Sequence, residues 1–141
     1  MSDGGVIISV KHNGELLISN PDLKDYKWYC FNGKPRYCQV IQNRSNCETI
    51  DFFDVDWNHQ VFVGLNPCVE NADYEPTKPT KLEIQKNIAE VLSSGIPFVR
   101  VDLFENNGKV HFGEMTFFPA NGTGGFRPNS WNLILGNMIH I

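Results

Sequence analysis

The hydrophobic and polar positions of this chain predict several β-hairpins and two helices. Short runs rich in β-branched and aromatic residues are separated by Asn-Gly turn sequences, which is typical of hairpins. Such turns occur at His12-Asn13-Gly14, Asn32-Gly33 and Asn106-Asn107-Gly108. Asp25 to Gln42 is expected to form two long strands around the second of these turns.

The segment after Pro79 is predicted to be a helix. Thr80-x-x-Glu83 matches a capping box, with Thr80 as the N-cap, and Gly95 followed by Pro97 ends the helix. The apolar stripe at helical spacing consists of Leu82, Ile84, Ile88, Val91 and Leu92. A short final helix is expected from Ser130 onward, with Trp131, Leu133, Ile134 and Ile139 in the core.

Strands joined by tight turns indicate an α+β fold, with a largely antiparallel β-sheet flanked by helices, which we expect on one face. At 141 residues the chain is expected to form one domain, residues 1–141.

The hairpin between Ile96 and Pro119 carries the most distinctive polar residues. Two loops are compatible with its turn sequence. A two-residue turn at Asn107-Gly108 would place Asp102 and Glu114 on opposite faces of the hairpin.

A three-residue loop with Gly108 in a bulge is the alternative, and we expect it. It opposes Arg100 to Glu114 and Asp102 to Phe112, and separates an apolar face from a polar one. The polar face then carries Arg100, Asp102, Glu114 and Thr116, and the apolar face Val99, Val101, Leu103 and Met115.

The polar face suggests a site for a hard cation and an anion. Two carboxylates close together repel each other unless a cation lies between them, and magnesium is the usual ion for one or two carboxylates with phosphates. Arg100 suits a phosphate or a developing oxyanion. The alternative is structural: an Arg100–Glu114 cross-strand ion pair with Asp102 at a wet edge.

Two other features of the sequence each allow two interpretations. If Asp51 to His59 is extended, one face carries Asp54, Asp56 and Asn58 and the other Phe53, Val55 and Trp57. This block is either an acceptor-recognition surface or a solvated strand edge with Trp57 in the core. The glycines between Gly122 and Arg127 would let backbone N–H groups approach an anion, although such loops usually only connect elements.

Composition excludes several classes of function. A net charge of −4 argues against non-specific nucleic-acid binding. No apolar run has membrane-spanning length, and we expect a cytoplasmic protein with reduced thiols. A two-residue turn at Asn32-Gly33 would pair Lys27 with Cys38 and Cys30 with Pro35, which places the two sulfur atoms on opposite faces.

Several blocks of the sequence resemble the TupA-like ATP-grasp family, roughly from Leu23 to Ile141, whereas residues 1–22 are less family-like. The blocks are DYKWYCFNGKPRYCQV, DFFDVDWNHQ, GIPFVRVDLFENNGKVHFGEMTFFPANG and LGNMIHI. The family is associated with teichuronopeptide and other surface-polysaccharide biosynthesis, and its members are often labelled glycosyltransferases. The resemblance implies the C-terminal subdomain of an ATP-grasp fold, with ATP and Mg²⁺ as cofactors and a carboxylate or sugar-linked acceptor.

The resemblance also implies roles for individual residues. Asp102 and Glu114 would bind magnesium, with Thr116 in support where the broader fold prefers Asn, and Arg100 would steady the transferred phosphoryl group. Lys27 would contact phosphate in the nucleotide cleft, although the strand pattern alone favours an exposed lysine. The candidate cofactor- or acceptor-binding glycines are Gly122, Gly124 and Gly125.

A whole ATP-grasp enzyme would carry a further subdomain upstream of Asp25. We therefore expect the chain to be incomplete as an enzyme, with a separate polypeptide as one way to complete the site. The second hypothesis is a non-catalytic module that binds a partner or glycan.

Overall fold

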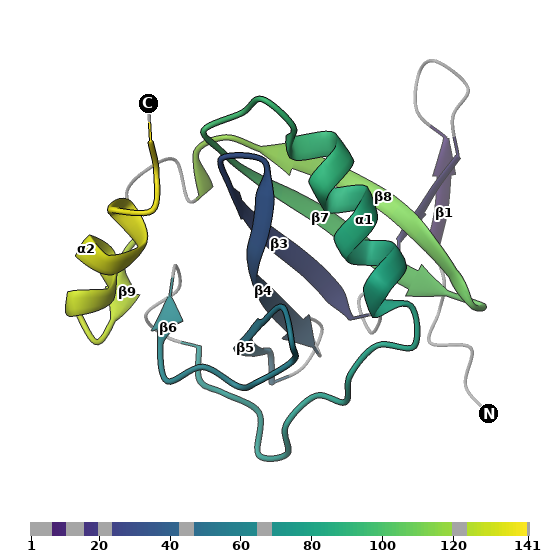
Figure 1. Ribbon diagram of the computed structural model, residues 1–141. Helices are drawn as coiled ribbons and strands as arrows, with labels where there is room; N and C mark the ends of the chain where they lie inside the picture. The colour runs from purple at the N-terminus through teal and green to yellow at the C-terminus, as the bar shows by residue number, and fades with distance from the viewer. Residues whose placement is uncertain are drawn as a thin grey trace.

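A five-stranded antiparallel sheet is the centre of the fold (Figure 1). The computed structural model describes residues 7–10, 16–19, 24–42, 47–64, 69–119 and 124–140. The strand order is β5-β4-β3-β7-β8, with β3 in the middle. The strands are β3 (Asp25–Phe31), β4 (Lys34–Gln42), β5 (Thr49–Asp54), β7 (Phe98–Asn106) and β8 (Lys109–Thr116). The predicted α+β class and the two long strands after Asp25 are confirmed.

Two small sheets accompany the main one. β1 (Ile7–Val10) pairs with β2 (Leu16–Ser19), as expected for the first hairpin, whose turn lies outside the described residues. β6 (Val63–Gly64) pairs with β9 (Phe126–Arg127). A side chain at Gly64 would clash with the Phe126 ring, so this glycine allows the ring to lie against the strand.

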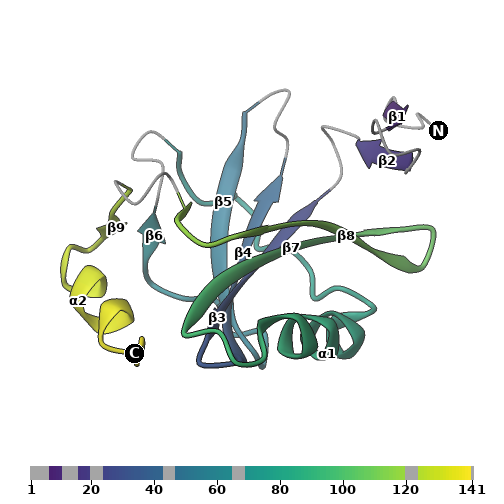
Figure 2. The ribbon, with the colours of Figure 1, turned by 90° about the horizontal axis from the view of Figure 1, so that it is seen from above.

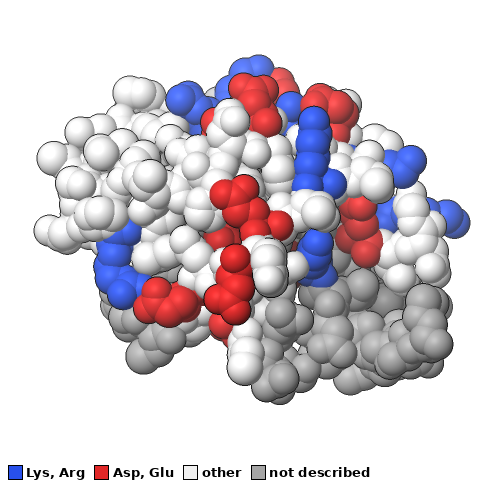
Figure 3. All heavy atoms as spheres, turned by 90° about the horizontal axis from the view of Figure 1, so that it is seen from below, with Lys and Arg blue, Asp and Glu red and all other residues white. Residues whose placement is uncertain are grey.

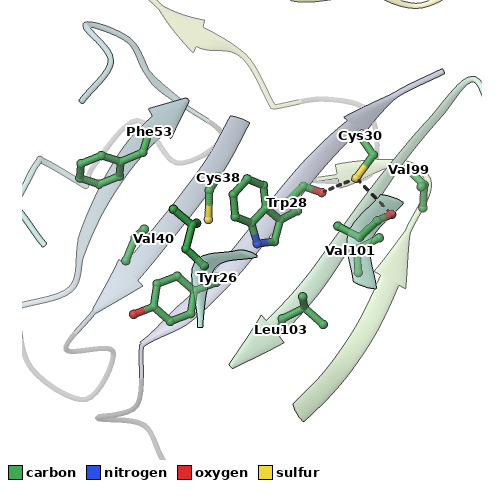
Figure 4. Packing of buried hydrophobic residues seen from close by; sticks show 11 residues of the cluster. Tyr26, Trp28, Cys30, Cys38, Val40, Phe53, Val99, Val101 and Leu103 are labelled. Atoms are coloured by element: carbon green, nitrogen blue, oxygen red, sulfur yellow. Dashed lines mark hydrogen bonds between the residues drawn. The ribbon is translucent and has the colours of Figure 1, made fainter. Parts of the chain in front are cut away.

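The two helices cover opposite faces of the sheet, so the expectation that both lie on one face was wrong. Figure 2 shows α1 (Leu82–Ser93) beneath β7 and β8, and α2 (Ser130–Gly136) at the far end beside β6 and β9. The reason is the composition of β3, which buries apolar side chains in both directions and therefore needs cover on both faces. The core under α1 includes Tyr26, Trp28, Cys30, Val40, Val101 and Leu103 (Figure 4). The core under α2 includes Tyr29, Phe31, Ile41, Phe52, Phe62 and Leu135.

The β3–β4 register differs from the predicted one, which paired Lys27 with Cys38. A bulge after Tyr29 shifts the pairing, so that Trp28 lies opposite Cys38 and Lys27 opposite Gln39, while the Cys30–Pro35 pair is as expected. Cys30 and Cys38 are therefore on the same face, not on opposite faces, and both are buried in the core under α1 (Figure 4).

Helix α1 occupies the predicted segment, but its N-terminus is stabilised differently. The N-cap is Lys81, and the predicted Thr80–Glu83 box does not form. The Glu105 carboxylate of β7 instead accepts hydrogen bonds from the Lys81 backbone N–H at 3.0 Å and the Thr80 hydroxyl at 3.2 Å. The Glu105 carboxylate of β7 therefore caps the N-terminus of α1. The spacing of residues within the helix segment could not reveal this contact.

The buried side of α1 is also more polar than its predicted stripe. Ile84 and Val91 are exposed, whereas Gln85, Ala89 and Ser93 are buried. The Gln85 amide accepts a hydrogen bond from Trp28 Nε1 at 2.9 Å, which explains how a polar side chain is tolerated there. In α2, Leu135 is buried and Trp131 and Ile139 pack against the core, but the predicted core residues Leu133 and Ile134 are exposed.

Candidate functional site

The β7–β8 hairpin brings its polar residues to one face by a route different from the predicted one. Its turn is the two-residue Asn107-Gly108, with both residues in the left-handed region, so the predicted three-residue loop was wrong. A bulge at Gly113 then shifts the register, and Asp102 lies opposite Glu114. The predicted pairs, Arg100 with Glu114 and Asp102 with Phe112, do not form.

The division into two faces is nevertheless as predicted. Arg100 lies opposite Thr116, and Val101 opposite Met115. Because directly opposed residues point to the same side of a sheet, Arg100, Asp102, Glu114 and Thr116 share one face. The apolar residues Val99, Val101 and Leu103 lie on the other face, in the core under α1 (Figure 4).

Lys27 and Asp102 form the buried centre of this polar face. They lie opposite each other on β3 and β7, and the Lys27 ammonium is 2.6 Å from Asp102 Oδ2. Lys27 also contacts the Asp25 carboxylate at 2.9 Å. The Lys27 residue is only 7% exposed, so the interpretation of it as an exposed strand lysine was wrong.

Arg100 completes a close arrangement of charges around Asp102. Its Nε donates to Asp102 Oδ1 at 2.8 Å, and its Nη2 donates to Asp102 Oδ2 at 3.0 Å and to the Thr116 hydroxyl at 3.2 Å. Glu114 is farther, with an oxygen 3.6 Å from Nη2, and its side chain is 67% exposed. Burial acts to lower the pKa of Arg100, but the hydrogen bond and charge of Asp102 outweigh it and raise the pKa.

The structural alternative for the hairpin, an Arg100–Glu114 ion pair with Asp102 at a wet edge, does not describe this arrangement. Asp102 is not at a wet edge, since the residue is 3% exposed, and it is the principal partner of Arg100. The positive charge between the Asp102 and Glu114 carboxylates therefore comes from the Arg100 side chain. Two cationic side chains, Lys27 and Arg100, lie among three carboxylates, those of Asp25, Asp102 and Glu114.

A magnesium ion fits the types of donor at this site but not their arrangement. Carboxylate and hydroxyl oxygens are suitable ligands, but each Asp102 oxygen already accepts hydrogen bonds from a cationic side chain. Over the described residues, no group of three His, Cys, Asp or Glu side chains is placed to hold a metal. A divalent ion at Asp102 would have to replace Lys27 or Arg100, so the roles of Asp102, Glu114 and Thr116 as ligands remain predictions.

The glycines named as candidates lie near α2 rather than in the charged cluster. Gly124 lines a pocket of about 230 Å³ together with Tyr29, Phe98 and residues of α2. Gly125 lies beside Asn132, whose side-chain oxygen accepts the Phe126 N–H at 2.8 Å. Gly122 lies outside the described residues. The pocket is linked to the cluster by Tyr29, which lies opposite Arg100.

The Asp51–His59 block has a structural arrangement. The chain does not stay extended: Asp54 accepts hydrogen bonds from the Asp56 and Asn58 N–H groups in a turn, so the predicted polar face does not form. Burial acts to raise the pKa of Asp54, but the bonds from Asn58 and Asp56 outweigh it and lower the pKa. Trp57 stacks on Phe53 with 4.3 Å between the ring centroids, in agreement with its predicted packing against the core.

Asp51 itself is buried behind this turn. One oxygen lies 2.8 Å from His59 Nε2, and the other accepts the Ala72 N–H at 3.1 Å. The residue is 1% exposed, so both contacts compensate for its burial. The Ala72 bond attaches the loop after β6 to the edge strand β5, and the His59 contact attaches the segment between β5 and β6 to the same strand. These contacts are a sufficient structural reason for Asp51 and His59.

Two residues that determine the site were missed in the sequence. A glycine inside a strand often marks a bulge, so Gly113 was a readable signal for the register shift. Its Cβ position would be 3.1 Å from the Asp102 carbonyl oxygen, which explains why glycine is favoured there. Asp25 precedes Lys27 by two residues and so shares its face, but the alternation gave no indication that Lys27 is buried against it.

The described residues on the face seen in Figure 3 form no large patch of one charge sign. Figure 3 shows positive and negative side chains interspersed over the middle of this face, while the left-hand end, where α2 lies, is largely uncharged. Among the described residues no helix is long and apolar enough to cross a membrane.

The sequence family described as "TupA-like ATPgrasp" matches residues 8–140, which is nearly the whole chain. The antiparallel sheet with its polar face belongs to an ATP-grasp protein, a class whose members bind ATP. The chain belongs to the TupA-like ATP-grasp family. The match includes residues 8–22, which precede the family-like blocks found in the sequence. No curated protein matches the chain. No solved structure matches it either.

Proposed function

We propose that this chain binds the phosphates of ATP on the polar face of its central sheet, as the nucleotide-binding portion of a TupA-like ATP-grasp protein. The observation that carries the proposal is the cluster of Lys27 and Arg100 around Asp102, in a chain of this family. A lysine and an arginine that converge on one carboxylate are spaced for oxyanions, since each can exchange a carboxylate oxygen for a phosphate oxygen.

Binding in this way requires the cations to change partners. Lys27 and Arg100 now point inward to Asp102, whereas Glu114 is the accessible acid of the group. A phosphate that approaches from the Glu114 side would compete with Asp102 for both cations. Catalysis of phosphoryl transfer is mostly positioning and charge neutralisation, so this chain needs no general base or nucleophile to contribute to it.

The proposed reaction class is ATP-dependent carboxylate activation through an acyl phosphate, in cytoplasmic synthesis of a surface polysaccharide or teichuronopeptide. The reaction class and the biosynthetic role are both proposed from membership of the TupA-like ATP-grasp family. The reaction class is also supported by the suitability of Arg100 for binding an oxyanion. A glycosyltransferase activity has no support in the cluster, which consists of charged groups suited to phosphate or carboxylate. The acceptor is a carboxylate or a sugar-linked compound, and a separate polypeptide is proposed to complete the site.

A titration with a non-hydrolysable ATP analogue and magnesium, followed by backbone and arginine Nε–H NMR shifts, tests the proposal. We expect saturable shifts at Lys27, Arg100, Asp102 and Glu114 at millimolar nucleotide. Arg100→Lys keeps the charge but removes the paired donors, and should weaken binding by about tenfold.

Lys34→Gln is the matched control, because Lys34 is an exposed strand lysine that pairs only with Glu90 in the described structure. It should leave the nucleotide affinity unchanged. If the folded protein shows no shifts, or if both variants weaken binding equally, the proposal fails and the non-catalytic module that binds a partner or glycan becomes the better hypothesis.

A further inference from the structure

The pocket beside Tyr29 is a separate, apolar compartment next to the charged cluster. Its volume is about 230 Å³. Its apolar walls come from Tyr29, Phe31, Phe98, Phe126, Leu135 and Ile139. None of the described residues that line it is charged. An apolar cavity of about 150 Å³ is enough to bind a benzene ring, so this pocket is of the right size for one substituted ring.

The two polar side chains in the described wall, those of Tyr29 and Asn132, already have partners. The Tyr29 hydroxyl donates to Gln39 at 3.0 Å. The Asn132 amide accepts the Phe126 N–H at 2.8 Å and donates to Asn129 at 2.7 Å. Among the described residues, a nucleobase in the pocket would find no free side-chain partner for its ring nitrogens and amino group, and leaving such groups unpaired is unfavourable. The wall therefore favours a ring without hydrogen-bonding edges.

The aromatic walls are arranged to receive another ring. Phe98 is tilted against Tyr29 and Phe31, with centroids 6.1 Å and 5.1 Å apart, and Phe126 meets Tyr29 edge-on at 6.4 Å. Tilted and edge-on contacts are the favoured geometries between aromatic rings. Phe126 is kept in place because its ring packs on Gly64, where no side chain intervenes.

The pocket and the charged cluster lie on the same face of the same strands. Phe98 precedes Arg100 by two residues on β7, and Tyr29 lies opposite Arg100 on β3. Residues two apart on a strand are about 6.6 Å apart and point the same way. A group seated in the pocket would therefore hold an attached carboxylate or phosphate close to Arg100.

We propose that this pocket binds an uncharged aromatic ring, or an apolar group of similar size, carried by the acceptor substrate and not by the nucleotide. The assignment of the ring to an acceptor substrate rests on the proposed nucleotide-binding function. The binding of a ring in the pocket is independent of that function. The acceptor would have its apolar group against Phe98 and Phe126 and its reacting group toward Arg100.

The test uses toluene as the neutral probe, with benzoate and benzylamine as charged rings of similar size. We expect saturable NOEs from toluene to the Leu135 and Ile139 methyl groups, and at least about fivefold weaker binding of both charged rings. Equal binding of all three, or no binding of toluene to the folded protein, would overturn the proposal.

Gly136 offers a way to close the pocket without touching the charged cluster. It lines the pocket, and a Cβ at this position meets nothing within 4 Å. Gly136→Leu should weaken toluene binding by about tenfold or more, while Gly136→Ala, which adds one methyl group, should change it far less. Ile139→Phe adds volume to the same wall and replaces the leucine variant if that variant does not fold.

The same variants separate this proposal from the nucleotide-binding one. Gly136→Leu should leave the affinity for the ATP analogue within about twofold, because the phosphates are proposed to bind at Lys27 and Arg100. Loss of both ligands in this variant would mean that the pocket receives the nucleobase, which overturns the assignment to the acceptor. Loss of nucleotide binding alone in Arg100→Lys would leave the ring site intact.

Discussion

Lys27 and Asp102, 75 residues apart in the sequence, are directly opposed on β3 and β7, with their charged atoms 2.6 Å apart in the protein interior. Arg100 binds the same carboxylate from its own strand. Burial of an ion pair is favourable only when both charges keep good partners, and removal of one partner leaves an uncompensated charge. Removing one member of the cluster should therefore be strongly destabilising.

Asp102→Asn should lower the free energy of unfolding by about 3 kcal/mol, because it removes the principal anion of the buried Lys27 and the half-buried Arg100. Urea denaturation at neutral pH measures the change. Glu114→Gln is the control, since Glu114 is exposed on the same face and its loss should cost less than about 0.5 kcal/mol. Equal destabilisation by the two substitutions would contradict a special role for Asp102.

Magnesium alone should not bind at the cluster. Both Asp102 oxygens are occupied by Lys27 and Arg100, so Mg²⁺ would have to displace a cation without gaining phosphate ligands. A titration with millimolar magnesium chloride, without nucleotide, should leave the amide shifts of Asp102 and the Nε–H signal of Arg100 unchanged. Saturable shifts that calcium and sodium fail to produce would show that Asp102 is available to the metal in the free protein.

Gly113→Ala should disturb the register that places Asp102 opposite Glu114. A Cβ at Gly113 would lie 3.1 Å from the Asp102 carbonyl oxygen, so the backbone has to move by a few tenths of an ångström. We expect a loss of about 1 kcal/mol and a shifted Arg100 Nε–H signal. Gly136→Ala, where the added methyl meets open space, is the control and should change neither quantity.

The polar face could be predicted from the sequence because strand alternation is local. Arg100, Asp102, Glu114 and Thr116 share a face, as predicted from the spacing within each strand. The pairing between the strands was predicted wrongly, because the bulge that Gly113 indicates was missed and it offsets the shorter turn. The predicted loop was one residue too long and the predicted strands lacked the one-residue bulge. These two errors cancelled, so the faces were assigned correctly.

Features that depend on contacts between distant segments of the chain could not be predicted from local alternation. The burial of Lys27 follows from its position on the central strand beside β7, which the sequence of β3 alone does not contain. The second helix was assigned to the wrong face because its position depends on the path of the chain after Pro119. Apolar spacing likewise misassigned Ile84 and Val91, whose places facing the sheet are taken by Gln85 and Ala89.

Glu105→Ala should destabilise the protein by about 1–2 kcal/mol, whereas Glu83→Ala should have little effect. Glu105 binds the Lys81 N–H, the Thr80 hydroxyl and the Gln85 amide, so its loss leaves the start of α1 without a partner from β7. Glu83 contacts only Lys86 in the described structure, at an exposed position. Urea denaturation of the two variants distinguishes the cap seen here from the capping box expected from the sequence, which would reverse their order.

The buried thiols should make the protein less stable as the pH rises above about 8.5, the ordinary thiol value. Burial raises the pKa of Cys30 to about 12, and it also raises the pKa of Cys38 well above its usual range. The neutral thiols are thus favoured in the folded state, so their contribution is complete below the unfolded pKa. It is lost as the pH rises toward the folded pKa, because the unfolded chain then binds fewer protons than the folded one.

Each of the two thiols should lower the free energy of unfolding by about 1.4 kcal/mol per pH unit above its unfolded pKa. Urea denaturation between about pH 8 and pH 10, below the ordinary tyrosine pKa, measures the slope. The double variant Cys30→Ala/Cys38→Ala should flatten it, since no thiol then ionises on unfolding at these positions. Alkylation provides a second measurement: the exposed Cys47 should react in the folded protein, whereas Cys30 and Cys38 should react only after unfolding. Rapid alkylation of Cys30 in the folded state would mean that the core under α1 opens far more readily than its packing against β3, β4 and β7 indicates.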